Sequence, residues 1–83
     1  MSNLYGDAPE AWHENEQIGR RASEWYNKKR TELDTPENRD RYVVIDSDTG
    51  EHEIGDTEDD AERRFVARYG SNRRAVLFHI GHF

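Results

Sequence analysis

Residues 42–46 read Tyr-Val-Val-Ile-Asp, residues 48–50 read Asp-Thr-Gly, and residues 53–56 read Glu-Ile-Gly-Asp. The first segment is a run of aromatic and β-branched residues, which predicts a strand. The second is a turn, because Asp and Gly tolerate the backbone angles that a tight reversal needs. The third is the returning strand. Since Ile54 is its one strongly apolar residue, we expect this strand to be short and to lie at an edge of the sheet.

The residues after this hairpin predict a helix and a third strand. Thr57 is a good N-cap, and the three acidic residues 58–60 suit the positive end of a helix dipole. The helix should run to Tyr69 and stop at Gly70. Residues 75–80, Ala-Val-Leu-Phe-His-Ile, then form a strand that is apolar on both faces. Such a strand is typical of a central position, or of one that pairs with a partner.

The residues before the hairpin predict one more helix. Pro9 suits a first helical turn, and Ile18, Ala22 and Trp25 share one helix face. The fold class is therefore α+β: an N-terminal helix is followed by a ββαβ unit, with a three-stranded antiparallel sheet of order 2-1-3 and helices covering one face. We expect one domain, divided into a frayed N-terminus (1–9), the helix (10–33), a linker (34–40) and the ββαβ module (41–83).

The composition indicates a small core. The chain has 83 residues, of which 33% are apolar and 36% are charged, so little apolar surface is available to bury. It contains no cysteine, which rules out disulfides and thiolate metal sites as extra support. Well-fitted packing or a partner chain is the remaining source of stability. We expect a cytoplasmic protein, without a signal peptide and without contact with a membrane.

Charge is distributed in blocks around a net value of −6. Residues 31–62 hold thirteen acidic side chains, whereas residues 63–83 hold five arginines and no acid. The favoured interpretation is that these blocks neutralise each other within the fold. An alternative is a regulator that contacts nucleic acid through the basic block, although the net acidity argues against it. The residues of that block are Arg63, Arg64, Arg68, Arg73 and Arg74.

Three patterns resemble catalytic or metal sites. Residues 48–50 match the aspartic-protease triplet, but that chemistry needs two aspartates that share a proton, so ordinary turn chemistry is the favoured interpretation. Residues 46–50, Asp-x-Asp-x-Gly, match a calcium loop poorly. His52, His79 and His82 would bind zinc only if the fold brought them together. A weak metal-binding or hydrolytic protein is therefore a second alternative, and we expect no catalytic residue, metal or cofactor.

The same residues carry a resemblance to a family. The pattern Tyr-Val-Val-Ile-Asp (42–46), Thr-Gly-Glu-x-Glu-Ile (49–54) and Ile-Gly (80–81) resembles a group of small bacterial proteins that have a helix followed by a strand-hairpin-helix-strand module. The resemblance covers residues 18–83. It implies a partner of a small retropepsin-like protein, in an arrangement similar to toxin–antitoxin pairs. It implies no catalytic residues.

These observations predict a non-enzymatic protein–protein interaction module, which the resemblance suggests is the antitoxin-like or regulatory member of a two-protein bacterial system. The partner would be a cognate protein or a second copy of the chain, through edge addition of the last strand or through the first helix. The competing interpretation is that the same side chains form the monomer's own core. The candidate contact residues are Trp12, Trp25, Tyr26, Val76, Phe78 and Ile80.

Overall fold

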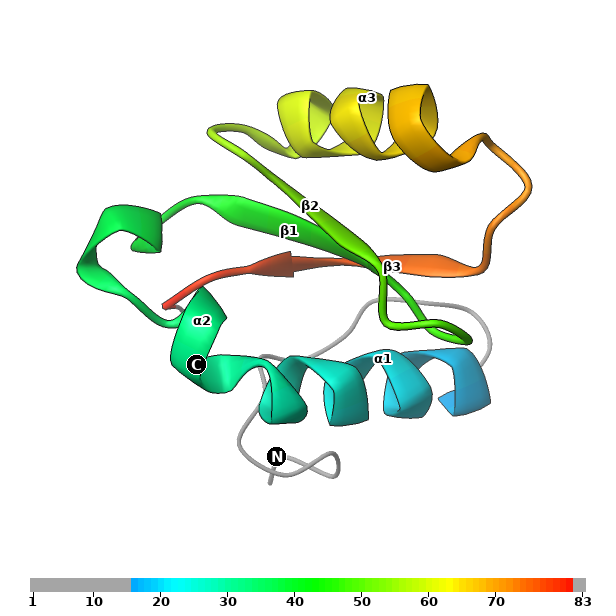
Figure 1. Ribbon diagram of the computed structural model, residues 1–83, viewed down its shortest axis with the longest axis horizontal. Helices are drawn as coiled ribbons and strands as arrows, with labels where there is room; N and C mark the ends of the chain where they lie inside the picture. Colours follow the sequence, from blue (N-terminus) through cyan, green and yellow to red (C-terminus); the bar gives the residue numbers. More distant parts are fainter. Residues whose placement is uncertain (1–15, 82–83) are drawn as a thin grey trace.

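The computed structural model describes residues 16–81, and it has the α+β fold expected from the sequence (Figure 1). The expected frayed N-terminus and residues 10–15 of the expected helix lie outside the described residues. The elements are, in chain order, α1 (Glu16–Lys28), α2 (Arg30–Leu33), the short 3₁₀ helix η1 (Pro36–Asn38), β1 (Tyr42–Asp46), β2 (His52–Gly55), α3 (Glu58–Tyr69) and β3 (Ala75–His79).

The three strands form one antiparallel sheet in the order β2-β1-β3, as predicted. The register places Val43 of β1 opposite Ile54 of β2 and Phe78 of β3. The hairpin sets the first pairing, because only the five residues 47–51 connect the two strands. The central strand is therefore β1, and β3 occupies an edge even though it is apolar on both faces.

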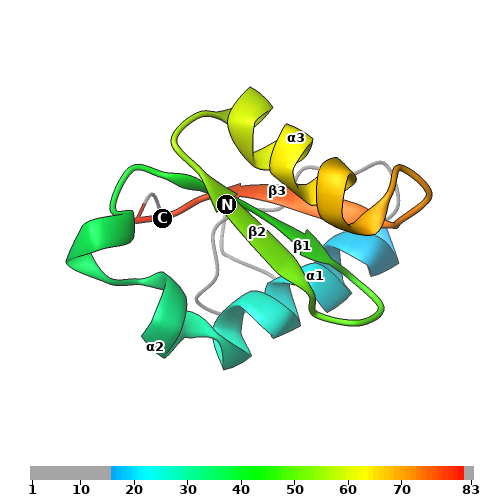
Figure 2. The ribbon, with the colours of Figure 1, turned by 45° about the horizontal axis from the view of Figure 1, so that its top comes forward.

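The two long helices cover opposite faces of the sheet, which corrects the expectation that helices cover one face (Figures 1 and 2). Val43 and Ile45 pack in the core between the sheet and α1, whereas Val44 packs with Phe65 of α3 on the other face. The reason is the alternation of side chains along a strand, since β1 carries apolar residues at consecutive positions and both of its faces need cover.

The helix expected over residues 10–33 is interrupted at Lys29. The N–H of Lys29 is shared between the carbonyls of Trp25 and Tyr26, and its φ of −97° and ψ of 8° turn the chain. The short helix α2 then follows and aims Leu33 into the core, where it is completely buried. Burial of this one side chain contributes about 1.5–3 kcal/mol, enough to favour the bend over a straight helix.

Both ends of α3 follow the predicted chemistry. The Thr57 hydroxyl accepts a hydrogen bond from the N–H of Asp60 at 3.0 Å, and the Asp60 carboxylate accepts one from the N–H of Asp56 at 3.2 Å. The helix ends at Gly70, whose N–H donates to the carbonyl of Val66. Gly70 has a φ of 88°, in the region where glycine is favoured.

Gly55 is the point where β2 and α3 touch, and we expect Gly55→Ala to lower the free energy of unfolding by roughly 1–3 kcal/mol. A Cβ at this position would lie 2.4 Å from the backbone nitrogen of Ala61, so the helix backbone would have to move. Urea denaturation would measure the change. Gly70→Ala is the matched control, because a Cβ there meets nothing within 4 Å and only the positive φ is strained. An equal or smaller loss at Gly55 would contradict this account.

Candidate functional site

Four of the six candidate contact residues lie in the core. Tyr26, Val76, Phe78 and Ile80 are each at most 1% exposed, between the sheet and the helices beneath it. The rings of Tyr26 and Phe78 pack with their centroids 5.2 Å apart. Their side chains therefore stabilise the chain itself, which was the competing interpretation. Trp12 lies outside the described residues.

Trp25 holds the hairpin turn against α1. Its Nε1 donates to the carbonyl of Ser47 at 3.1 Å, and its ring lies so close to Gly50 that a Cβ there would be 2.5 Å from a ring carbon. Lys28 lies over the same ring, 4.9 Å from a ring centroid. The partly buried indole of Trp25 therefore contacts other residues of the same chain and stabilises the packing of α1 against the hairpin turn.

Asp46 anchors the same turn and is not arranged for catalysis or for cation binding. Its Oδ1 accepts the N–H groups of Asp48 and Thr49, and its Oδ2 accepts a hydrogen bond from Arg73 at 2.8 Å. Burial acts to raise the pKa of Asp46, but the hydrogen bonds from Arg73 and from the two backbone N–H groups outweigh it and lower the pKa. The guanidinium of Arg73, which also binds Glu51 at 2.7 Å, takes the place that a cation would need.

The histidines do not converge within the described residues. His52 lies on β2 and His79 on β3, at opposite edges of the sheet. Burial, followed by the nearby charge of Lys29, lowers the pKa of His52. Residues 16–81 contain no group of three or more His, Cys, Asp or Glu side chains that could hold a metal ion. The two remaining histidines of the sequence, His13 and His82, lie outside the described residues.

The basic block is largely neutralised by acidic residues. Arg63 and Arg64 pair with acidic residues one turn earlier in α3, while Arg68 reaches Glu53 on β2. In the described part of the chain only Arg74 of this block has no ion pair within 4.0 Å. The acidic and basic blocks therefore meet each other in space, as the favoured interpretation of the sequence predicted.

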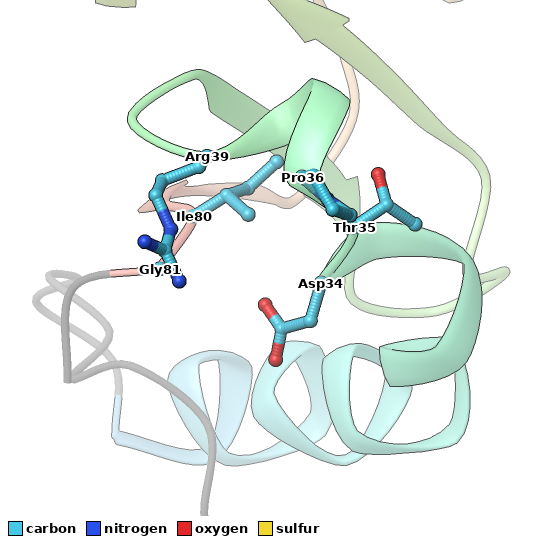
Figure 3. A pocket seen from close by; sticks show the side chains of 6 residues that line it. All are labelled: Asp34, Thr35, Pro36, Arg39, Ile80 and Gly81. Carbon is cyan, nitrogen blue, oxygen red and sulfur yellow. The ribbon is translucent and has the colours of Figure 1, made fainter.

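A pocket of about 670 Å³ lies between α2, η1 and the end of β3 (Figure 3). The side chains of Asp34 and Arg39 both reach this space, and Ile80 and Gly81 form another wall. Asp34 is already engaged, because its Oδ1 accepts the hydrogen bond of the buried Tyr26 hydroxyl at 2.9 Å. Burial, together with this bond to Asp34, raises the pKa of Tyr26, so the hydroxyl stays protonated and is no general base.

The outer edge of β3 presents backbone groups that point away from β1. The N–H of Ile80 donates to the carbonyl of Arg41, and the N–H of Ser47 donates to the carbonyl of Arg74. In an antiparallel pair, hydrogen-bonded and non-hydrogen-bonded positions alternate, so Val76 and Phe78 also bond to β1. The N–H and C=O groups of the intervening residues face outward. We call these residues, Ala75, Leu77 and His79, the β3 edge.

The other edge of the sheet is protected by charge. His52 of β2 lies 3.3 Å from the ammonium of Lys29, and Glu53 of β2 is paired with Arg68 of α3 at 2.9 Å. Charged side chains beside an edge strand disfavour the addition of another strand. Residues 75–79 contain no proline, lysine or acidic residue, although His79 lies 3.9 Å from the carboxylate of Asp40.

A groove of about 230 Å³ runs beside the β3 edge on the face that α3 covers, and its lining includes Glu62 and Arg73 besides apolar side chains. It lies where α3, which packs mainly over β2 and β1, makes fewer contacts with β3. Val66 on its wall is 48% exposed, and it is the one large apolar side chain among the described residues that is exposed. We call it the edge groove; its apolar lining consists of Val44, Phe65, Val66, Ala75 and Leu77.

Sequence reasoning named Val76, Phe78 and Ile80 of the last strand as candidate contact residues. Val76, Phe78 and Ile80 point into the core, while Leu77 and Val66 line the edge groove. The sequence did indicate that Val66 would be exposed. It lies outside the stripe formed by Ala61, Phe65 and Tyr69, which is the side of the helix expected to be buried.

The chain matches no family model, and comparisons with curated proteins and with solved structures likewise give no match. In the described part of the chain, no helix has the length and apolar character needed to cross a membrane.

Proposed function

We propose that this chain is a non-enzymatic protein–protein interaction module that acts by adding β3 to the sheet of another chain. The observation that carries the proposal is the β3 edge, where outward-facing backbone groups lie beside an apolar groove. In this mode of recognition, main-chain hydrogen bonds supply affinity, and pockets for alternate side chains supply specificity. The edge groove supports this proposal, because its position beside the β3 edge would let it receive side chains on one face of an added strand.

The resemblance of residues 18–83 to partners of small retropepsin-like proteins fits this proposal. It would make the chain the antitoxin-like or regulatory member of a cytoplasmic two-protein system in bacteria. The nucleic-acid alternative gains little support, because four of the five arginines in the basic block are already paired with acidic residues.

A peptide-display selection on the isolated protein tests the proposal. We expect the selected peptides to be extended, to carry apolar residues at alternate positions, and to slow amide hydrogen exchange at Ala75, Leu77 and His79. Ala75→Pro should weaken peptide binding by roughly tenfold or more, because proline removes an outward N–H while leaving the bonds to β1 intact.

Ala75→Ser is the matched control, since it keeps the N–H and should bind within about twofold of the parent. The amides of Val76 and Phe78 should be protected with or without peptide, because they bond to β1. Peptides that bind the Ala75→Pro variant equally well, or that protect amides elsewhere, would contradict edge addition.

A further inference from the structure

We infer that the pocket between α2, η1 and the end of β3 binds a small organic monocarboxylate, whose carboxylate pairs with Arg39 and whose apolar body lies against Pro36 (Figure 3). The volume of about 670 Å³ is in the range of small-molecule sites. This inference does not depend on the proposed function, because none of the residues that line this pocket belongs to the β3 edge or lines the edge groove.

The positive charge of the pocket comes from Arg39. Its side chain is exposed and lines the pocket, and among residues 16–81 its guanidinium has no ion pair within 4.0 Å. By contrast, the nearby Arg41 is already paired with Asp56 at 2.9 Å. A guanidinium presents parallel N–H donors that match the two oxygens of a carboxylate, and such charge-assisted pairs are strong and directional. The pocket therefore offers a partner for an anionic group.

Asp34 reaches the same space but does not cancel the charge of Arg39 (Figure 3). Its Oδ1 accepts the hydrogen bond of the Tyr26 hydroxyl at 2.9 Å, and its Oδ2 lies 4.0 Å from the guanidinium of Arg30. The negative charge of Asp34 is thus balanced on its own side of the pocket. A ligand ammonium beside Asp34 would also meet Arg30, and a second ligand carboxylate would be repelled by Asp34. The arrangement therefore favours a monocarboxylate over a zwitterion or a dicarboxylate.

The apolar surface of the pocket lies beside this charge. Pro36 begins η1, is exposed and lines the pocket with a ring that has no hydrogen-bonding group. The methylene stem of Arg39 adds further apolar surface. Gly81 leaves the space beside this stem open, because a Cβ there would lie 3.6 Å from the Cγ of Arg39. A short alkyl chain would cover surface that water otherwise contacts.

Buried contacts hold the walls of the pocket in place. Leu33 at the end of α2 and Ile80 after β3 are both completely buried. The N–H of Asp40 donates to the carbonyl of Ile80 at 3.1 Å, and the N–H of Ile80 donates to the carbonyl of Arg41 at 2.9 Å. The pocket is therefore formed before a ligand arrives, and binding mainly has to order the side chain of Arg39.

Titration of the full chain with sodium hexanoate at constant ionic strength, followed by two-dimensional amide NMR, tests the inference. We expect saturable shifts of the amides of Thr35, Arg39 and Gly81 and of the Arg39 Nε–H, with a Kd on the order of 1 mM. Hexanamide keeps the chain without the charge, and acetate keeps the charge with little chain. Each should bind at least about tenfold more weakly. Adipate, which adds a second carboxylate, should also bind more weakly than hexanoate.

Arg39→Gln removes the charge and should weaken hexanoate binding by roughly tenfold or more. Arg20→Gln is the matched control, because it removes an exposed arginine of α1 that does not line the pocket; its affinity should stay within about twofold of the parent. Absence of saturable binding up to roughly 50 mM overturns the inference. Equal binding of hexanoate and hexanamide, or full affinity in Arg39→Gln, also overturns it. Peptide binding at the β3 edge is a separate measurement, and these results would leave it unchanged.

Discussion

Phe78→Ala is expected to lower the free energy of unfolding by about 3–5 kcal/mol, the largest effect of any single side chain that we consider. Phe78 is 1% exposed and packs against Tyr26 and the other residues of the core between the sheet and α1. Truncation to alanine removes this buried area and leaves a cavity that the two flanking strand positions cannot fill.

This loss would be a large part of the total stability, which for a domain of this size is roughly 4–12 kcal/mol. Urea denaturation followed by tryptophan fluorescence would measure it, because Trp25 packs against the same core. Val66→Ala is the control and should change stability by less than about 0.5–1 kcal/mol, since Val66 is 48% exposed. If Phe78→Ala costs no more than the control, the assignment of Phe78 to the core is wrong and the side chain would be available to a partner.

Asp46→Ala is expected to lower the free energy of unfolding by about 2–4 kcal/mol. The carboxylate is 2% exposed and accepts hydrogen bonds from the N–H groups of Asp48 and Thr49 and from Arg73. Its removal leaves these donors without their partner at the turn where the hairpin meets β3. Arg73 is 32% exposed and can recover water, so the cost stays below that of a fully buried ion pair.

Asp48→Ala is the matched control for this turn. Asp48 carries the same charge two residues away, but its ion pair with Arg21 is on the surface, with side chains 47% and 58% exposed. Such exposed pairs contribute about 0.2–1 kcal/mol. Equal losses at the two positions would show that the buried network around Asp46 has no special role.

The dependence of stability on pH gives a second measurement on Asp46. Its pKa in the folded chain lies below the ordinary value of 3.8, so the unfolded state binds the proton more tightly. The stabilisation is therefore complete above pH 3.8 and is lost as the pH falls through the lower pKa of the folded chain. Wild-type protein should lose stability in this acid range, and Asp46→Ala should lose less over the same interval.

Local signals in the sequence were sufficient for most of the secondary structure. The Asp-Thr-Gly turn, the N-cap at Thr57 and the stop at Gly70 act within a few residues of chain, and the structure confirms each of them. The order of the sheet also followed, because a short hairpin fixes one pairing of β1 and only its other side remains for β3.

Other features depended on contacts between distant residues. Nothing near Lys29 in the sequence breaks a helix, and the interruption there follows from the burial of Leu33 against the sheet. Asp46 and Arg73 are 27 residues apart in the sequence. The ion pair through which Asp46 stabilises the fold could therefore not be predicted from either segment alone.

The sequence by itself determined the three strands and α3, and it predicted a helix that includes α1, because turns, caps and side-chain alternation act over a few residues; it did not predict α2 or η1. The tertiary structure alone decided that α1 and α3 cover opposite faces of the sheet (Figure 1). It also decided that the edge groove lies beside β3. A helix stripe specifies that one side must be buried, but it does not specify which face of the sheet it meets or how far from the edge it lies. That lateral position leaves Val66 exposed and Leu77 only partly buried beside the candidate interaction site.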